Sequence, residues 1–330
     1  MLFMLIAFTL TACSSDDNES ENNNQTNHPK RTYRLEVQAE NGAKTRALSL
    51  DQTGKILTPS WEEGEKLGVH TWFDNGLYYE PIYIGTLSAQ ETGNPTTFTG
   101  DVQDQPEYHY QMSKGTKLLF VYPNPTSFGH VLSYDEGYDK DGRPINQDGT
   151  IGTIASAFDY ATAKAEVDKI TENNDKLYIM LKGGNKLTFK NHTAIVAFTV
   201  VDENDTPLLP AKFIVNGKGL VKTYNILNAI QKNIDPDQQD IDPYTCFYDG
   251  TSPTTYQGGL EISVANPESP IYVAMANKYD EPIDYSFFVS ARPKNNSQLF
   301  SYECKMKANL KPGTFYATKL KMKKVDQWDN

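Results

Sequence analysis

This sequence contains few cysteines, no long helical repeat of apolar residues and no net positive charge. Only three of its 330 residues are cysteine, and acidic residues outnumber basic ones to give a net charge of −11. Because non-specific nucleic-acid binding needs a basic face, the charge argues against nucleic acid as a partner. Long apolar helical repeats are missing, whereas Gly, Pro, 20 Tyr and 15 Phe are spread along the chain. This composition favours an all-β protein of many short strands.

The motifs of common catalytic and metal sites are missing as well. The sequence has no Gly-x-Ser-x-Gly elbow and no phosphate-binding glycine loop. Its five histidines are scattered, without the spacing of a zinc site. Acidic clusters that begin at Asp135 and Asp235 lack the spacing of a calcium loop. We therefore predict no catalytic residues, no metal and no cofactor, and we expect that the protein is not an enzyme.

The first 12 residues form an apolar run that ends at a cysteine. The run is shorter than the roughly 20 residues of a membrane-spanning helix and predicts a signal peptide. A leucine and two small residues directly precede Cys13, and this arrangement resembles a bacterial lipobox. The resemblance implies that Cys13 is acylated and becomes the first mature residue. The alternative is an ordinary secretory signal that happens to contain a cysteine.

Residues 13–30 contain no large apolar side chain and predict a disordered tether. The acidic cluster of this tether resembles the export tag of surface-exposed lipoproteins in Bacteroidetes-type bacteria. Together with the lipobox, it implies a surface-exposed lipoprotein that a lipid anchor holds in the outer membrane.

Residues 33–39 alternate between apolar and polar side chains. A period of two places the apolar set on one face of a sheet. That set consists of Tyr33, Leu35, Val37 and Ala39. A turn-like Asn-Gly-Ala segment follows, and then a basic site that ends at Arg46. A single cut after Arg46 would therefore detach this strand from the rest of the domain, although Arg46 also fits an ordinary solvated loop.

Further strands are predicted along the rest of the chain. They are expected at residues 66–73, 77–84, 96–100, 116–122, 187–190, 192–200, 212–215, 259–265, 271–275, 285–291, 299–306 and 315–322. Residues 126–153 indicate a long loop, and residues 155–167 are the best candidate for a helix, on propensity alone. A boundary near residue 185 gives one β-sandwich domain at 31–185, a second at 186–325 and a tail at 326–330.

Two features of the second half leave alternatives open. Cys246 and Cys304 can form a disulfide in an exported protein, or remain as two buried thiols. The last predicted strand carries Lys319, Lys321 and Lys323 on one face, and we interpret this row as protection of an edge strand.

Three groups of short motifs occur in a fixed order. The first is Lys44-Thr45-Arg46-Ala47 followed by Trp61-x-x-Gly64-Glu65-x-Leu67-Gly68-Val69. The second is Phe98-Thr99-Gly100, followed by residues 117–123, which end in Tyr-Pro. The third is Leu310-x-Pro312-Gly313-x-x-Tyr316. Behind a lipobox, this series resembles the fimbrillin family of Bacteroidetes, the subunits of type V pili and their relatives.

The resemblance implies two transthyretin-like β-sandwich domains in tandem and assembly by strand addition. An arginine-specific protease would cut at Arg46 and remove the strand that carries Tyr33, Leu35, Val37 and Ala39. The open groove would then accept an extended segment from another pilin subunit. The implied partners are other pilin subunits, the outer membrane and the protease, and the implied location is the outer membrane or, after processing, the fimbrium.

Two alternatives compete with a polymerising subunit. If the last strand completes its own domain, the protein is expected to be an anchor, a cap or a non-polymerising adhesin. The other alternative is a glycan-binding surface lipoprotein associated with a polysaccharide uptake system. Its sugar platform would consist of Tyr78, Tyr79, Tyr83, Tyr108 and Tyr110. Ordinary cross-strand packing also explains these rings.

Overall fold

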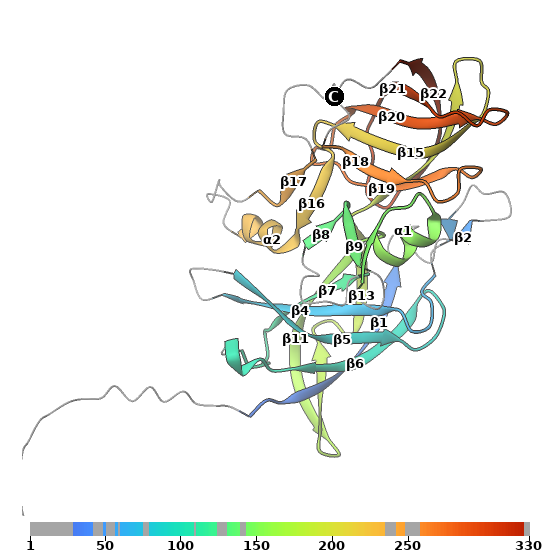
Figure 1. The fold of residues 1–330 in the computed structure, drawn as a ribbon. Helices are drawn as coiled ribbons and strands as arrows, with labels where there is room; N and C mark the ends of the chain where they lie inside the picture. The colour runs from blue at the N-terminus through green and yellow to red at the C-terminus, as the bar shows by residue number, and fades with distance from the viewer. Residues whose placement is uncertain are drawn as a thin grey trace, which may run out of the picture.

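The structure is a computed structural model that describes residues 29–41, 49–50, 57–58, 60–74, 79–108, 110–123, 131–138, 143–234, 242–247 and 258–326. The described elements are mostly strands, which form two large sheets with a smaller layer between them (Figure 1). The expected all-β class is confirmed.

The first sheet contains eight strands. They are β1 (Thr32–Asn41), β4 (Lys66–Asp74), β5 (Tyr79–Ala89), β6 (Thr96–Gln103), β7 (Lys117–Tyr122), β11 (Ala161–Asn173), β12 (Lys176–Leu181) and β13 (Lys186–Asn191). Their order is β12-β1-β13-β11-β7-β4-β5-β6, and β1 also pairs with β6 while β11 pairs with β12. These additional pairings close the sheet on itself around a hydrophobic core. Trp61 lies in this core with its ring 4.8 Å from that of Phe98 and 5.1 Å from that of Tyr122.

The second sheet contains seven strands. They are β14 (Ala194–Asp202), β15 (Leu208–Gly217), β18 (Leu260–Ser263), β19 (Ile271–Met275), β20 (Ile283–Pro293), β21 (Phe300–Ala308) and β22 (Phe315–Val325). Their order is β18-β15-β20-β21-β22-β14-β19. No pairing among the described strands joins β18 to β19, so this sheet stays open on one side.

The last strand, β22, is an interior strand of the second sheet. It pairs in parallel with β14 from Phe315 to Met322 and is antiparallel to β21 at its other end. Leu320 and Met322 are buried in the second hydrophobic core. The interpretation of the lysine row as edge protection is therefore wrong, because β22 has a neighbour on each side.

A smaller layer connects the two sheets. It contains β8 (Val131–Ser133), β9 (Glu136–Tyr138), β10 (Pro144–Asn146), α1 (Ile151–Ala157), β16 (Val221–Asn225), α2 (Ile226–Ile234) and β17 (Tyr244–Cys246). The remaining elements are a hairpin of β2 (Ser49–Leu50) and β3 (Leu57–Thr58), and the short 3-10 helix η1 (Pro106–Tyr108). Because β8 pairs with β16, backbone hydrogen bonds connect the two halves of the chain directly.

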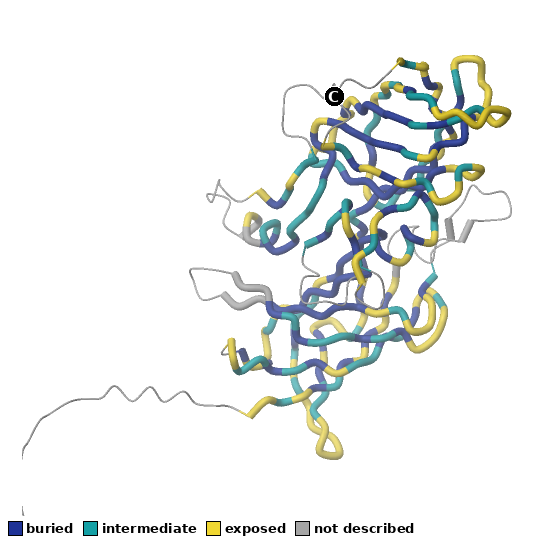
Figure 2. The backbone as a smooth tube through the Cα atoms, in the orientation of Figure 1, coloured by how far each residue is buried: buried dark blue, intermediate teal, exposed yellow. Residues whose placement is uncertain are grey.

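A third hydrophobic core lies in this connecting layer. It joins Leu119 and Tyr134 from the first half to Val221 and Tyr272 from the second. Figure 2 shows buried stretches that run through both sheets and through the layer between them. The two halves therefore share apolar contacts and are not independent units on a flexible connection.

Residues 147–149, from the first half, fill the open side of the second sheet. The Ala274 N–H on β19 donates to Gln147 Oε1 at 2.8 Å, and Gln147 Nε2 donates to the Ala274 and Tyr134 carbonyls at 3.0 and 2.8 Å. The Tyr272 N–H donates to the Gly149 carbonyl at 2.9 Å, and the Ala265 N–H donates to the Asp148 carbonyl at 3.0 Å. The segment therefore bonds to β19 on one side and to the chain just after β18 on the other.

Two local expectations are wrong. The predicted helix at residues 155–167 is instead α1, which begins after its N-cap Thr150 and ends at Ala157, followed by β11. Pairing of β11 with β7 and with β12 outweighs the helix propensity of these residues. The expected loop at residues 126–153 contains the short strands β8, β9 and β10 in its described part.

Candidate functional site

The strand that the sequence marks as removable, β1, lies inside the closed first sheet. It is antiparallel to β6 from Thr32 to Ala39. On its other side it runs parallel to β12 at Tyr33 and Arg34, and parallel to β13 from Gln38 to Asn41. Both edges of β1 are therefore hydrogen bonded, and its removal would open the sheet between β6 on one side and the consecutive strands β12 and β13 on the other.

The apolar face of β1 is completely buried. Tyr33, Leu35, Val37 and Ala39 are each 0% exposed and belong to the first core. The predicted inward orientation of these four side chains is confirmed. Burying a side chain such as Leu or Val stabilises a fold by about 1.5–3 kcal/mol. The three larger side chains of β1 thus contribute an amount comparable to the typical total stability of a domain.

Asn185 closes the seam between β1 and its parallel neighbours. Its side-chain Nδ2 donates to the Glu36 carbonyl on β1 at 2.6 Å, while its Oδ1 accepts from the Leu181 N–H at 2.8 Å. The Gln38 N–H donates to the Asn185 carbonyl at 2.7 Å. The side chain bridges the stretch where β1 changes partner from β12 to β13. Asn185, near which the sequence placed a domain boundary, therefore helps to hold β1 in the first sheet. The first sheet continues beyond this residue to Asn191.

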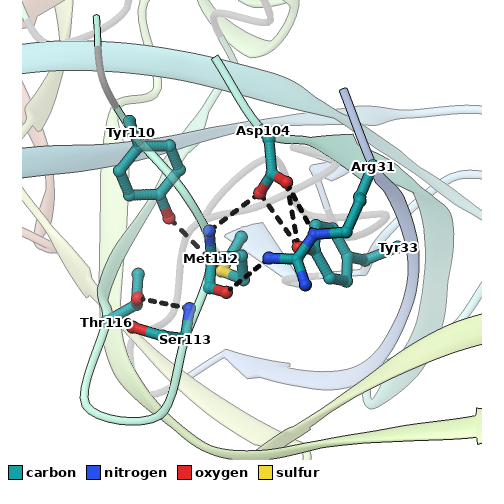
Figure 3. Close-up of polar contacts among 7 residues, drawn as sticks. All are labelled: Arg31, Tyr33, Asp104, Tyr110, Met112, Ser113 and Thr116. Carbon is teal, nitrogen blue, oxygen red and sulfur yellow. Dashed lines mark hydrogen bonds and ion pairs between the residues drawn. The ribbon is translucent and has the colours of Figure 1, made fainter. Parts of the chain in front are cut away.

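A buried carboxylate fixes the beginning of β1 (Figure 3). Asp104, which is 2% exposed, accepts hydrogen bonds from Arg31 Nε at 2.9 Å and from the Tyr33 hydroxyl at 2.9 and 3.1 Å. It also accepts from the Met112 N–H at 2.8 Å. Arg31 in turn donates to the Met112 carbonyl at 3.3 Å. We call Arg31, Tyr33, Asp104 and Met112 the Asp104 clamp.

The electrostatics of the clamp keep Tyr33 protonated. Burial first, and then the hydrogen bond to Asp104, raise the pKa of Tyr33 above its ordinary value. Burial likewise raises the pKa of the neighbouring Tyr110 to about 12. The Tyr33 hydroxyl thus remains a donor throughout the physiological pH range. A buried carboxylate that loses its partners becomes strongly destabilising, so the clamp depends on β1 remaining in place.

The other predicted site residues lie elsewhere. Cys13 and Arg46, the predicted lipidation and cleavage residues, are outside the described residues. Cys246 is on β17 and Cys304 is on β21, in different sheets, and the structure does not join their sulfurs. Of the two alternatives for these cysteines, the disulfide is therefore not seen. Burial raises the pKa of the Cys304 thiol to about 12.

The tyrosines of the suggested sugar platform differ in exposure. Tyr108 is 53% exposed, whereas Tyr110 is buried with its hydroxyl 3.3 Å from Met112 Sδ. Tyr83 is partly buried, and its hydroxyl contacts Thr86. Tyr78 and the side chain of Tyr79 lie outside the described residues. Of these rings, Tyr110 is not available to stack on a ligand.

The described residues offer neither a cluster of metal ligands nor a membrane-spanning helix. That part of the chain contains no group of three or more His, Cys, Asp or Glu side chains arranged to hold a metal ion. Among the same residues, no helix is long and apolar enough to cross a membrane.

Asp104 and Asn185 were not identified from the sequence, although one signal pointed to Asp104. Arg31 precedes Tyr33 by two positions and therefore belongs to the inward face of the strand. A cation on a buried face requires an acidic partner. The acidic partner of Arg31 is Asp104, which directly follows the end of β6. No alternating pattern in the sequence extends to that position.

Compared with known proteins, the sequence matches no family profile and no curated protein. Several solved structures resemble its fold. A candidate cell adhesion protein from Bacteroides uniformis is 14% identical, with 90% of this chain and 97% of that chain covered and a TM-score of 0.41. One from Bacteroides ovatus is also 14% identical, with 90% and 98% covered and a TM-score of 0.42. A candidate adhesin from Bacteroides ovatus is 12% identical, with 98% and 100% covered and a TM-score of 0.34. At these identities and TM-scores, the likeness assigns neither a family nor a function.

Proposed function

We propose that this protein is a fimbrillin-like surface lipoprotein, a structural or adhesive component of a pilus that is assembled by protease-triggered strand exchange. The observation that carries the proposal is the position of β1, which fills the first sheet with a fully buried apolar face. The motif order that resembles the fimbrillins supports it. The two transthyretin-like domains that this resemblance implies are part of the same proposal.

In this proposal, lipidation at Cys13 holds the precursor in the outer membrane and residues 13–30 act as its tether. An arginine-specific protease cuts after Arg46, so that β1 is then held only by non-covalent contacts. Trp61 follows the cut in sequence and stays in the core against Phe98 and Tyr122. The remaining sheet thus keeps its aromatic centre.

The burial of β1 favours exchange over simple release. Tyr33, Leu35 and Val37 would expose their whole side chains on leaving, which makes an empty groove unfavourable. An incoming extended segment from another pilin subunit offsets that loss, because it forms the same main-chain hydrogen bonds and fills the same pockets. The cut makes such replacement possible by detaching the strand.

The position of β22 favours an acceptor role for this subunit. β22 is paired with β14 along most of its length and buries Leu320 and Met322 at home. Donating this strand would open the second sheet. Acting as an acceptor, by contrast, requires only the loss of β1.

An arginine-specific protease tests the proposal on the purified chain that begins after Cys13. Mass spectrometry should show cleavage at Arg46. Because β22 stays in its own sheet, a labelled peptide of residues 31–41 is then added as the donor strand, and gel electrophoresis without boiling should show the label on the protein band. The matched control is Arg46→Lys, which removes the protease site, keeps the charge and should take up no label. A wild-type chain that stays uncut, or that takes up no peptide after the cut, would overturn the proposal, and retention of the uncut monomer on a polysaccharide affinity gel would favour the glycan-binding alternative.

A further inference from the structure

We propose that Asp104 makes the β1 groove selective for an incoming strand that carries a basic residue and, two positions later, a tyrosine. This inference rests on the proposed strand exchange and adds the chemistry of the partner segment. The preferred occupant is an extended segment with the pattern basic-x-Tyr-x-apolar-x-apolar-x-small, which reproduces Arg31, Tyr33, Leu35, Val37 and Ala39.

The contacts of Asp104 carry this inference. Among the described residues, three groups donate to its carboxylate, and two of them, Arg31 Nε and the Tyr33 hydroxyl, belong to β1 and the residue just before it. When this segment leaves, the Met112 N–H is the donor that remains among the described residues. An incoming strand that covers Asp104 again without bringing donors would desolvate a carboxylate and leave it largely unpaired, which opposes binding.

The same carboxylate sets the register of the incoming strand. A shift by one residue turns the apolar face outward, so alternation alone excludes it. A shift by two residues keeps the apolar face inward, and alternation alone does not exclude it. Such a shift places either Leu35 or Arg31 at the position of Tyr33, so Asp104 no longer has a cation and a hydroxyl at the two positions from which they now donate. Asp104 therefore distinguishes registers that the apolar pockets treat as equivalent.

The direction of the strand is fixed by its neighbours. The segment must run antiparallel to β6 and parallel to β12 and β13, as β1 does. In that direction its basic residue meets Asp104 and its small residue takes the place of Ala39, beside Thr96 and Leu187. Reversal would place the basic residue at the opposite end, away from the carboxylate.

The chain contains a natural mismatched strand for comparison. β22 also presents alternate inward residues, Tyr316, Thr318, Leu320 and Met322. If Tyr316 is aligned with Tyr33, however, the position of Arg31 is taken by Thr314, which carries no charge. A second copy of β22 is therefore expected to be a poor occupant of the groove.

Peptide exchange into the cut protein tests this selectivity. The full chain is cleaved after Arg46 and mixed with fluorescent peptides, and binding is followed by anisotropy. The panel contains residues 31–41 unchanged, the same peptide with Arg31→Ala, with Tyr33→Phe and with both changes, and residues 314–323 from β22. Loss of one charge-assisted hydrogen bond should weaken binding about 10- to 100-fold, so the Arg31→Ala peptide should fall in that range. The doubly changed peptide and the β22 peptide should bind more weakly still.

A matched change in the groove checks the origin of the effect. In an Asp104→Asn chain the amide oxygen still accepts from the Met112 N–H and from a tyrosine hydroxyl, but the negative charge is gone. The Arg31→Ala penalty should shrink to less than about threefold. If this chain does not fold, the peptide panel on the wild-type chain decides the question by itself.

The outcomes separate the two proposals. If the unchanged, Arg31→Ala and Tyr33→Phe peptides all bind with equal affinity, or if the β22 peptide matches the unchanged one, the selectivity is wrong while strand exchange stands. If no peptide, including the unchanged one, enters the cut protein, strand exchange itself is wrong and the selectivity falls with it.

Discussion

The two large sheets of this protein are completed in different ways. The first sheet closes on itself through β1, a strand from its own beginning. The second sheet remains open between β18 and β19, and residues 147–149 from the first half occupy that opening. The first half is thus complete only with a strand that one cut can detach, whereas the second depends on a segment that nothing in the sequence marks for removal.

β1 and β22 show the same difference at the level of side chains. Each has a parallel neighbour on one side and an antiparallel neighbour on the other. β1 is fixed by ionic and phenolic hydrogen bonds to a buried carboxylate. β22 instead makes ion pairs from Lys319 and Lys321 to Asp205, at side chains that are more than half exposed. Buried polar contacts favour one partner and one register, whereas exposed ion pairs discriminate little.

The largest expected effect comes from breaking the contact between the halves. Gln147→Leu keeps the volume but leaves the Ala274 N–H and the carbonyls of Ala274 and Tyr134 without their bonds. Each unsatisfied buried group costs about 1–3 kcal/mol, so we expect a loss of about 4 kcal/mol in the free energy of unfolding. Urea denaturation followed by tryptophan fluorescence measures it.

The matched control for this change is Gln90→Leu. Gln90 is exposed and its side-chain Nε2 donates to the nearby Ser88 carbonyl, so replacing this side chain should change stability by less than about 0.5 kcal/mol. Hydrogen exchange should also show faster exchange of the β19 amides in Gln147→Leu. Wild-type protection of the Ala274 amide in that variant would contradict the role assigned to residues 147–149.

A smaller effect is expected from the ion pairs at β1 and β22. Arg31→Ala leaves the buried Asp104 without its cation, and because Arg31 itself is partly exposed we expect a loss of about 2 kcal/mol. Lys321→Ala removes an exposed ion pair and should produce no measurable loss. Thermal and urea unfolding of the two variants side by side measure the difference. Equal losses would mean that the clamp is no stronger than a surface ion pair.

The hydroxyls of Tyr33 and Tyr316 provide a further comparison between β1 and β22. Tyr33→Phe removes the buried hydrogen bonds to Asp104 and should cost about 1 kcal/mol. Tyr316→Phe removes an acceptor for the exposed Lys311 N–H, at 2.9 Å, and a long bond to the Asn309 carbonyl, at 3.4 Å. Water can replace both, so stability should hardly change. Urea midpoints of both variants at one protein concentration provide the measurement. A larger loss for Tyr316→Phe than for Tyr33→Phe would mean that the tyrosine hydroxyl stabilises β22 more than β1.

The last prediction concerns thiol chemistry and is measured first on the wild-type fold. Burial raises the pKa of Cys304 from its ordinary 9.0 to about 12. The folded state thus holds this proton more tightly. Its contribution to stability is complete below pH 9 and is lost as the pH rises through 12.

Alkylation with iodoacetamide at pH 8 measures this shift. With a pKa about three units higher, the thiolate fraction of native Cys304 is roughly 1000-fold lower than in urea, and its reaction should be slower in proportion. Gln147→Leu, which loosens the second sheet, should accelerate the reaction, whereas Arg31→Ala, which acts on the first sheet, should not. Equal acceleration by both variants would show that the halves open as one unit.

Much of the fold was predictable where a pattern is local. The alternation at residues 33–39 predicted which side chains of β1 face inward, and the runs at 66–73, 116–122 and 271–275 predicted β4, β7 and β19. The prediction failed at residues 161–167, where good helix formers lie in β11 between two partner strands. Propensity is a small preference per residue, and ladder hydrogen bonds with packing outweigh it.

The candidate site was likewise predictable only where the pattern is local. The sequence by itself determined that one strand near the start has a fully apolar face and is followed by a basic site, because side-chain alternation and charge can be read from neighbouring residues. Only the tertiary structure decided that this strand lies between β6 and the parallel strands β12 and β13, that Asp104 and Asn185 hold it, and that residues 147–149 complete the second sheet. Those contacts join residues more than 70 positions apart in the case of Asp104, about 150 for Asn185 and more than 120 for Gln147. They depend on which groups remain unpaired when the sheets close, and no local pattern encodes that requirement.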